Sequence, residues 1–203
     1  MRRESEVKEL LILNAIRLIA EGGFEKATTK ELTYCSGNLP DFKMNEVYIY
    51  RIFGSKESLY EAAFVRLDME LFSAFRNATV SIGDFATETK EKLHELFMRV
   101  WNFIMRNEDR CRCYVRYYYS IYFKGEVLVS HKKRFEQITD ALAPIFKPEA
   151  DVFAVLHSVF HVLLDFGIRI YNGDLKDDVE NRTHIFNVLY CMMMTYLKDS
   201  VTA

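Results

Sequence analysis

Proline and glycine are scarce in this 203-residue chain, which contains three prolines and eight glycines. Because these residues punctuate strands and turns, their scarcity argues against a fold of many short strands and favours long helices. Half of the residues are apolar. The chain can therefore bury a compact core, and disorder is not expected away from its termini.

Cysteine and long hydrophobic runs are also rare. The four cysteines show no spacing typical of a disulfide framework: Cys35, Cys111, Cys113 and Cys191. This favours a reducing environment. No segment approaches the roughly 18 uncharged apolar residues that a membrane span requires. We therefore expect a soluble, cytoplasmic protein with no membrane partner.

The chain lacks a strong charge of either sign. A formal net charge of -2 argues against a protein that coats nucleic acid over its whole surface. Residues 1–56 carry nine Lys and Arg against eight Asp and Glu, so this segment is only slightly basic. If it binds DNA, a few well-placed cations and helix N-termini must supply the attraction.

The N-terminal third has clear helix signals. Apolar residues recur at helical spacing over 5–21, and two glycines ending at Gly23 stop that helix. Thr28 followed by Glu31 forms a capping box, which opens a short second helix over 29–36.

Two further caps follow. Asn45 is expected to cap a third helix that Gly54 ends, and Ser55 to cap a fourth that runs to about residue 78. The remaining periodicity predicts helices near 87–106, 109–123, 128–146, 150–172 and 177–199. The expected fold is all-α, with about nine helices.

Three short helices with a turn before the last resemble a helix-turn-helix, in which the second helix of the pair enters the major groove. Here the pair is 29–36 and 45–53. The turn is interrupted by an insertion of six residues, Asn38 to Lys43.

The segment from Ile12 to about Ala63 resembles the TetR family of transcriptional regulators. ILNAIRLIAEGGF resembles the family's first helix with its glycine stop, and ATTKEL the opening of its second helix. IYRIFGSKESLYEAA resembles the end of the recognition helix joined to the fourth helix. The resemblance implies a DNA-binding domain over 1–56 and a larger effector-binding and dimerisation domain over 57–203.

Five residues are candidates for contacts with the DNA backbone. Thr28 and Thr29 lie at a helix start, where hydroxyls and free N–H groups suit a phosphate oxygen. Lys30 lies in the same turn and can reach a phosphate or a base edge. Lys56 lies in the first turn of the fourth helix, so its cation and the helix dipole act on the same phosphate. Tyr50 can offer its hydroxyl to the backbone.

Base contacts are expected from the first turn of the recognition helix, formed by Asn45, Glu46, Val47 and Tyr48. Arg51 follows on the same helix, and a unit built for packing alone has no need of it beside Tyr48 and Lys56. In family members the positions of Tyr48, Tyr50 and Lys56 commonly touch DNA.

Two features depart from the family pattern. The family's turn is very short, and a glycine is common where this chain has Val47. The insertion is expected to loop out without shifting the helix register, because lengthening a surface loop costs little entropy. We expect the stretch to bind DNA with an unusual target; the alternative is a helical ligand- or protein-binding module that has lost this recognition.

Aromatic residues are dense between 97 and 123. In the family's architecture the middle helices enclose an effector cavity, and an aromatic lining would suit an apolar or planar molecule. Ordinary core packing is the alternative for each residue singly. Candidate pocket residues are Phe97, Trp101, Tyr117, Tyr118, His157 and His161.

His157 and His161 lie four residues apart, with Asp165 four further on, and form one stripe of a helix. Such a pair could chelate a metal, but polar residues that face a pocket or a second copy are the favoured interpretation. We therefore expect no metal, no cofactor and no catalytic residue. The basic stretch HKKR at 131–134 is expected to be a solvated helix start.

The last two predicted helices are apolar around most of their circumference, which indicates burial on all sides. A second copy of the chain is the natural cover, and a four-helix bundle of this kind is also how the family dimerises. Candidate interface residues are Phe153, Leu156, Phe160, Leu164, Phe186, Leu189 and Met193.

Together these features predict a homodimeric, non-enzymatic transcription regulator. We expect a repressor that binds an inverted repeat in double-stranded DNA and responds to a small-molecule effector. An enzyme is disfavoured, because the chain lacks an activated nucleophile, a glycine-rich phosphate loop or a convincing metal set.

Overall fold

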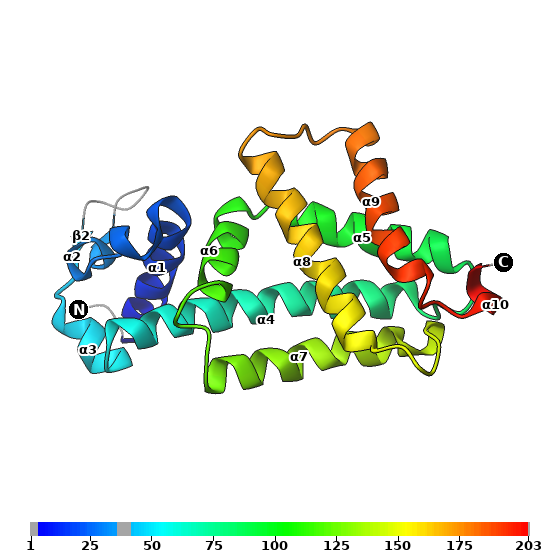
Figure 1. Cartoon of the computed structure of the whole chain (residues 1–203). Coiled ribbons are helices and arrows are strands. Elements are labelled where there is room, and N and C mark those ends of the chain that lie inside the picture. The colour runs from blue at the N-terminus through cyan, green and yellow to red at the C-terminus, as the bar shows by residue number, and fades with distance from the viewer. Residues whose placement is uncertain (1–3, 36–41, 203) are drawn as a thin grey trace. The chain divides into compact units, whose positions relative to one another are not determined.

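The computed structural model describes residues 4–35 and 42–202. Its fold is all-α, as predicted: the described residues form ten α-helices, a short 3-10 helix and one pair of two-residue strands (Figure 1). The chain divides into two compact units. This division rests on packing, and the functional boundary after residue 56 stays a prediction.

The first unit comprises the described parts of Met1–Met69 together with Asp109–Val129. Its elements are α1 (Glu4–Lys26), α2 (Thr29–Leu32), β1 (Tyr34–Cys35), β2 (Phe42–Lys43), α3 (Val47–Phe53), the start of α4 (Lys56–Ile82) and α6 (Glu108–Tyr118). The other unit contains the end of α4, α5 (Thr89–Met105), most of α7 (Glu126–Leu142), η1 (Ala143–Ile145), α8 (Val152–Tyr171), α9 (Val179–Met194) and α10 (Asp199–Thr202).

The predicted glycine stop in α1 is present. Gly23 has φ 76° and ψ -168°, which is outside the helical region and is accessible mainly to glycine. A short helical segment continues beyond it to Lys26. The chain then reaches Thr28, whose hydroxyl accepts a hydrogen bond from the Glu31 N–H at 3.2 Å, as the predicted cap requires.

Helix α2 is shorter than predicted, because it ends at Leu32 and not at Ser36. The Thr33 hydroxyl donates back to the carbonyls of Thr29 and Lys30, and the carbonyl of Thr33 accepts from the Met44 N–H at 2.8 Å. The bond between Thr33 and Met44 lies next to an antiparallel pair of strands, which takes the place of a further helical turn.

The insertion is partly built into that pair. In β1 and β2, Tyr34 pairs with Lys43 and Cys35 pairs with Phe42. The insertion therefore does not simply loop out at its C-terminal end. The residues from Asn38 to Asp41 lie outside the described residues.

A cluster of aromatic rings joins α1, α4 and α6 in the first unit. The ring of Phe64 stacks on Tyr114 and Tyr117, with centroids 5.0 and 4.6 Å apart, and Phe24 lies 5.1 Å from Tyr60. The Arg116 guanidinium donates to the carbonyl of Ile19 at 2.6 Å. Helix α6 is thereby packed against α1 and α4 within this unit.

The second unit is centred on the packing of α5, α8 and α9 (Figure 1). A Cβ atom at Gly167 of α8 would lie 3.0 Å from the Ile104 side chain of α5, so glycine permits this close approach. Tyr171 donates its hydroxyl to the Ile104 carbonyl at 2.5 Å. Helix α8 is long and apolar enough to cross a membrane by length and composition alone, and in the structure it packs against α5 and α9.

The connection between α8 and α9 is tied to α5. The indole N–H of the fully buried Trp101 donates to Asp177 at 2.9 Å, and Arg182 donates to the same carboxylate at 2.7 Å. The Arg182 guanidinium holds the pKa of Asp177 below its usual value. Asp177 therefore satisfies a buried donor that would otherwise lack an acceptor.

Replacing Asp177 with alanine is expected to lower the free energy of unfolding by about 1–3 kcal/mol, because the indole N–H of Trp101 stays buried without its acceptor. Urea unfolding followed by circular dichroism at pH 7 measures this loss. Asp174→Ala, an exposed position in the same connection, is the control and should change stability by less than about 0.5 kcal/mol. Equal losses in the two variants would contradict the assigned role of Asp177.

Candidate nucleic-acid interface and ligand cavity

Helix α3 has one buried face and one exposed face. Ile49 is fully buried, whereas Val47 and Tyr50 are 62% and 55% exposed. The helix packs on α1. Asn45 accepts a hydrogen bond from the Val47 N–H at 2.9 Å, but the N-cap of α3 is Glu46, one residue later than predicted. An exposed apolar side chain beside an exposed tyrosine is suited to contact with another surface.

Arg51 is already engaged in the first unit. Its guanidinium pairs with the Glu4 carboxylate at 3.1 Å and lies 4.5 Å from the ring centroid of Tyr48. Both members of the ion pair are more than half exposed, so the pair contributes little to stability. The predicted contact residues Tyr48 and Arg51 are thus in contact with each other, and the half-buried Glu46 precedes them at the N-cap.

The predicted phosphate contacts lie at two helix starts. Thr28 and Lys30 are exposed and Thr29 is half-buried at the start of α2. Ser55 caps α4 by accepting from the Ser58 N–H at 3.0 Å, as predicted, and Lys56 follows in the first turn. Hydroxyls, helix N-termini and ammonium groups are suited to bind phosphate oxygens.

Side-chain hydrogen bonds join α1 and α4 to the segment that contains α2. The Tyr60 hydroxyl donates to the carbonyl of Ala27 at 2.6 Å, which joins α4 to the residue before the α2 cap. Burial raises the pKa of Tyr60, so the hydroxyl stays a donor. Asn14 of α1 donates to the carbonyls of Leu32 and Tyr34.

Sequence reasoning did not identify Tyr60 and Asn14 as positioning residues. Asn14 left one signal, since it is an amide within an otherwise apolar helical stretch. The sequence gave no such signal for Tyr60, because a tyrosine at an inward-facing helical position is also expected in an ordinary packed core.

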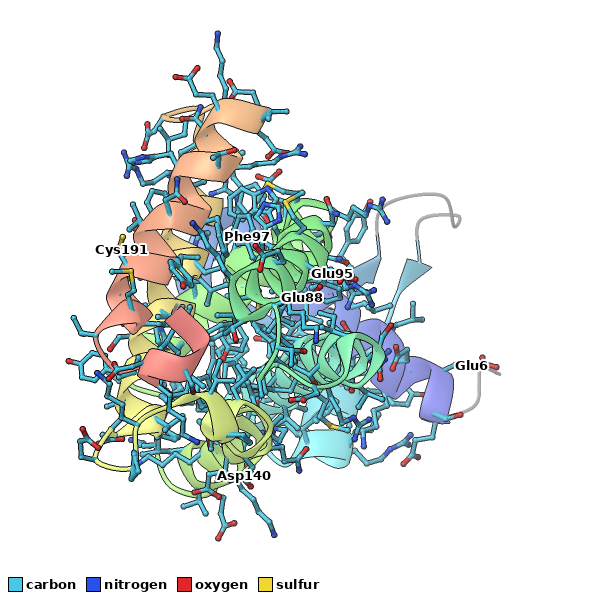
Figure 2. All side chains as sticks on the ribbon, turned by 90° about the vertical axis from the view of Figure 1, so that its right-hand side faces the viewer. Glu6, Glu88, Glu95, Phe97, Asp140 and Cys191 are labelled. Atoms are coloured by element: carbon cyan, nitrogen blue, oxygen red, sulfur yellow. The ribbon has the colours of Figure 1, made fainter. Side chains whose placement is uncertain are left out.

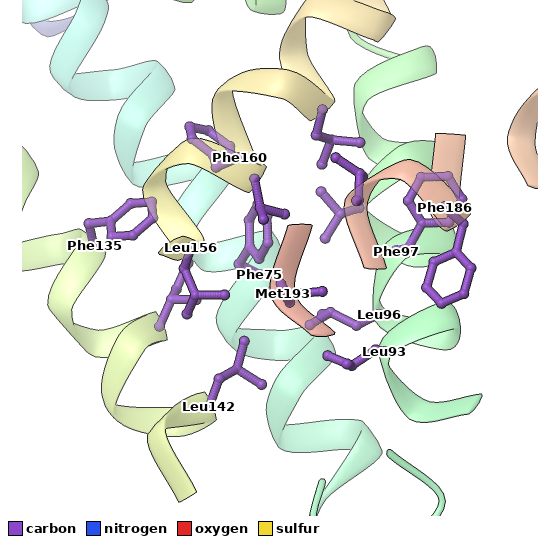
Figure 3. Close-up of a pocket in the computed structure, with 15 residues that line it drawn as sticks. Phe75, Leu93, Leu96, Phe97, Phe135, Leu142, Leu156, Phe160, Phe186 and Met193 are labelled. Atoms are coloured by element: carbon purple, nitrogen blue, oxygen red, sulfur yellow. The ribbon is translucent and has the colours of Figure 1, made fainter. Parts of the chain in front are cut away.

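The second unit encloses an apolar cavity of about 70 Å³ (Figure 3). Side chains of α4, α5, α7, α8 and α9 line it, and every lining residue is apolar. Phe75, Phe135 and Phe160 contribute three of the aromatic rings. Such a lining suits a hydrocarbon and offers no hydrogen bond to a polar group.

Of the predicted pocket residues, Phe97 lines the cavity. Trp101 is buried beside Asp177 and is not part of the lining. Tyr117 and Tyr118 belong to α6 in the first unit, where Tyr117 stacks on Phe64. The density of aromatic residues along the sequence therefore did not show which of them belong to the core of the first unit and which to that of the second.

The residues predicted for a dimer interface face inward in the single chain. Phe153 is half-buried and stacks on His157, and Leu164 is buried. The others line the apolar cavity: Leu156, Phe160, Phe186, Leu189 and Met193. Other parts of the same chain cover these side chains, so the predicted residues lie on the inner face of the two helices. A helix that is apolar on all sides gives no sign in the sequence of which face packs within the chain.

The outer face of α9 carries a shallow surface groove. Figure 2 places Cys191 on the outer side of this helix, and His184, Asn187, Val188 and Met192 complete the groove. Its exposed area is mostly apolar. This groove is a surface that another helix can cover.

Three histidines gather in the second unit beside the cavity. The ring centroids of His157 and His161 are 4.4 Å apart, and His131 lies 6.4 Å from His157. Burial, followed by the nearby His131 and Lys132, lowers the pKa of His157. Burial and the neighbouring histidines lower the pKa of His161 to about 4.

His131 was expected on a solvated helix start, and that prediction is wrong. It lies within α7, is 1% exposed, and packs against Phe72 and Phe135. Within residues 4–35 and 42–202, no group of three or more His, Cys, Asp or Glu is arranged to hold a metal ion.

No protein-family model matches the sequence, and no curated protein matches it closely enough to count as a relative. Solved structures do resemble the fold. A TetR family transcription regulator from Marinobacter aquaeolei VT8 is 17% identical, with a TM-score of 0.72 over 95% of this chain and 98% of the other. A candidate TetR family regulator from Shewanella sp. PV-4 is 16% identical, with a TM-score of 0.72 over 94% and 97%.

A third similar structure is the fatty acid degradation regulator FadR from Bacillus halodurans. It is 15% identical, with a TM-score of 0.64 over 89% of this chain and 96% of the other. Likeness at such identities shows a shared fold. The chain has the fold of the TetR family of transcription regulators, as its sequence motifs predicted.

Proposed function

We propose that the chain is a DNA-binding transcription regulator, and specifically a repressor that binds an inverted repeat as a homodimer. The observation that carries this proposal is the exposed face of α3, presented beside two capped helix starts within a fold that TetR family regulators share. Two such faces in a dimer would meet successive major grooves about 34–36 Å apart.

The division of labour on DNA follows from the side chains. Thr28, Thr29 and Lys30 at the start of α2 and Lys56 at the start of α4 hold phosphates, which sets the register without reading sequence. Asn45, Val47 and Tyr50 present amide, apolar and hydroxyl groups toward the groove. Val47 suits a thymine methyl group, because apolar contact is how that base is distinguished.

Arg51 has a separate role in this proposal. It is held by Glu4 and Tyr48 in the free chain. A phosphate near α3 competes with the exposed Glu4 carboxylate for the same guanidinium. Because the ion pair is weak, exchange of Glu4 for a phosphate costs little.

A second copy of the chain is proposed to cover the outer faces of α8 and α9. The groove of His184, Asn187, Val188, Cys191 and Met192 supports this, because it is mostly apolar and exposed in the single chain. Two helices from each copy would form a four-helix bundle. The DNA-binding domain is then residues 1–56, and residues 57–203 form the effector-binding and dimerisation domain.

The cavity of the second unit is proposed to bind a small-molecule effector. Its wholly apolar lining favours a hydrocarbon, and a fatty acid degradation regulator is among the proteins of similar fold. The effector would act by binding one of two conformations of the dimer more tightly, which shifts the balance between DNA-bound and free states. We propose no catalytic role and a cytoplasmic location.

Combined replacement of Tyr50 and Lys56 with alanine is expected to abolish selection of a palindrome from a random duplex pool, because a groove hydroxyl and a phosphate anchor are lost together. Lys56→Ala alone should lower affinity for the selected duplex evenly across sequences and reduce the salt-dependence slope by about 1. Fluorescence anisotropy at several salt concentrations measures both effects.

The matched control replaces Tyr119 and Lys124, an exposed tyrosine and lysine elsewhere in the first unit, with alanine. It should select the same palindrome as the wild type. If the wild type itself enriches no sequence, the proposed DNA recognition is wrong. The alternative function, a ligand- or protein-binding module, would then be favoured.

Val188→Arg is expected to convert the dimer to a monomer, because it places a charge in the α9 groove where an apolar surface would be buried. Sedimentation equilibrium should give twice the mass of one chain for the wild type and a single-chain mass for the variant. Val129→Arg, at an exposed valine of α7, is the control and should remain a dimer. A monomeric wild type at micromolar concentration would refute this interface.

A further inference from the structure

We propose that Asp165 and Arg169, on the outer face of α8, form two reciprocal ion pairs with a second copy of the chain. These pairs select an identical copy as the partner and set the antiparallel register of the two α8 helices. The inference rests on the proposed homodimer. It adds the charged groups that choose the partner, which the apolar groove on α9 cannot do by itself.

The outer face of α8 carries a stripe of polar side chains. Ser158, Asp165 and Arg169 are exposed, and their spacing along the sequence places them on one side of the helix. The opposite side is buried within the second unit, where Leu156 and Phe160 line the apolar cavity. The two charged groups therefore face away from the core, as contact with a second copy requires.

Asp165 and Arg169 do not pair with each other in the single chain, although an acid four residues before an arginine on a helix is well placed to do so. Among the described residues, no ion pair involves either side chain. The Arg169 guanidinium instead lies 5.7 Å from the ring centroid of Phe166 on the same helix. Both charges are therefore available to a partner.

The order of the two charges makes this face complementary to a copy of itself. A two-fold axis brings the same patch of both copies together, so that one residue meets a second residue of the partner and the reverse contact also forms. When two α8 helices cross in antiparallel directions between positions 165 and 169, Asp165 of each copy meets Arg169 of the other. A face with two charges of one sign would repel its own copy.

The charges act mainly on the choice of partner. The groove on α9 is mostly apolar, so it supplies area for burial but accepts many apolar surfaces. An exposed ion pair contributes little to stability, whereas like charges brought together across an interface are strongly unfavourable. The pairs therefore exclude chains of similar shape that present a different order of charges at this place.

Charge reversal in the full-length chain tests the proposal. Asp165→Arg gives the face two positive charges, and Arg169→Asp gives it two negative charges. Each variant alone is expected to raise the dimer dissociation constant about a hundredfold, because like charges then meet twice across the two-fold axis. Sedimentation velocity from nanomolar to micromolar concentrations measures this change.

An equimolar mixture of the two variants is expected to regain the dimer, because each arginine then meets an aspartate of the other chain. A fluorescent label on one variant detects these mixed dimers directly. The chain that carries both changes has its charges exchanged and should dimerise as tightly as the wild type. Recovery in the mixture also shows that both single variants are folded.

The matched controls reverse exposed charges of the second unit outside α8 and α9. They are Asp140→Arg on α7 and Arg76→Asp on α4. Both should dimerise as the wild type does, since neither position lies on the proposed interface.

The outcomes separate this inference from the proposed dimer. If the wild type is a dimer and both single variants dimerise equally tightly, the charge pairs are wrong and the dimer remains. If the single variants are monomers and neither the mixture nor the exchanged chain restores a dimer, the assigned pairing is also wrong. If the wild type is a monomer at micromolar concentration, the dimer proposal and this inference both fail.

Discussion

The hydroxyl of Tyr60 donates to the carbonyl of Ala27 inside the first unit, and the geometry of the candidate DNA face depends on this bond. It joins the first turns of α4 to the residue that precedes the cap of α2. A buried carbonyl without a hydrogen-bond donor costs about 1–3 kcal/mol, so a placement of α4 that leaves the Ala27 carbonyl unpaired is unfavourable. The helix starts proposed to bind phosphate therefore keep a fixed separation in the free chain, so the proposed binding would not have to order them.

The proposed DNA-binding surface of this unit lies in a segment that is only slightly basic. Its cations are few, and one of them, Arg51, is partly neutralised by Glu4. The proposed binding energy comes mainly from oriented N–H groups, hydroxyls and two lysines at fixed places, not from a high net charge. Such a surface depends more on shape and hydrogen bonds than a strongly basic one, and the cost of misplacing a single helix is correspondingly high.

The second unit reflects a different compromise. Its apolar side chains could pack without a gap, yet a cavity remains between five helices. The unfilled space lowers stability, because its lining loses dispersion contacts that close packing would give. Filling of this space by the proposed hydrocarbon effector would offset that cost.

The sequence alone determined what depends on neighbouring residues. The caps at Thr28 and Ser55 and the stop at Gly23 were predicted correctly, because each involves groups within about three positions along the chain. Together with helical periodicity they gave the all-α fold and the resemblance to TetR regulators.

Only the tertiary structure decided what depends on distant residues. The pairing of β1 with β2 shortened α2, Asn14 and Tyr60 became positioning residues, and His131 was buried despite its basic neighbours. The inner and outer faces of α8 and α9 likewise could not be told apart by periodicity, since both carry apolar residues. Burial depends on contacts between residues that are distant in the sequence. A local sequence pattern indicates that a residue can be buried, but not which residues will cover it.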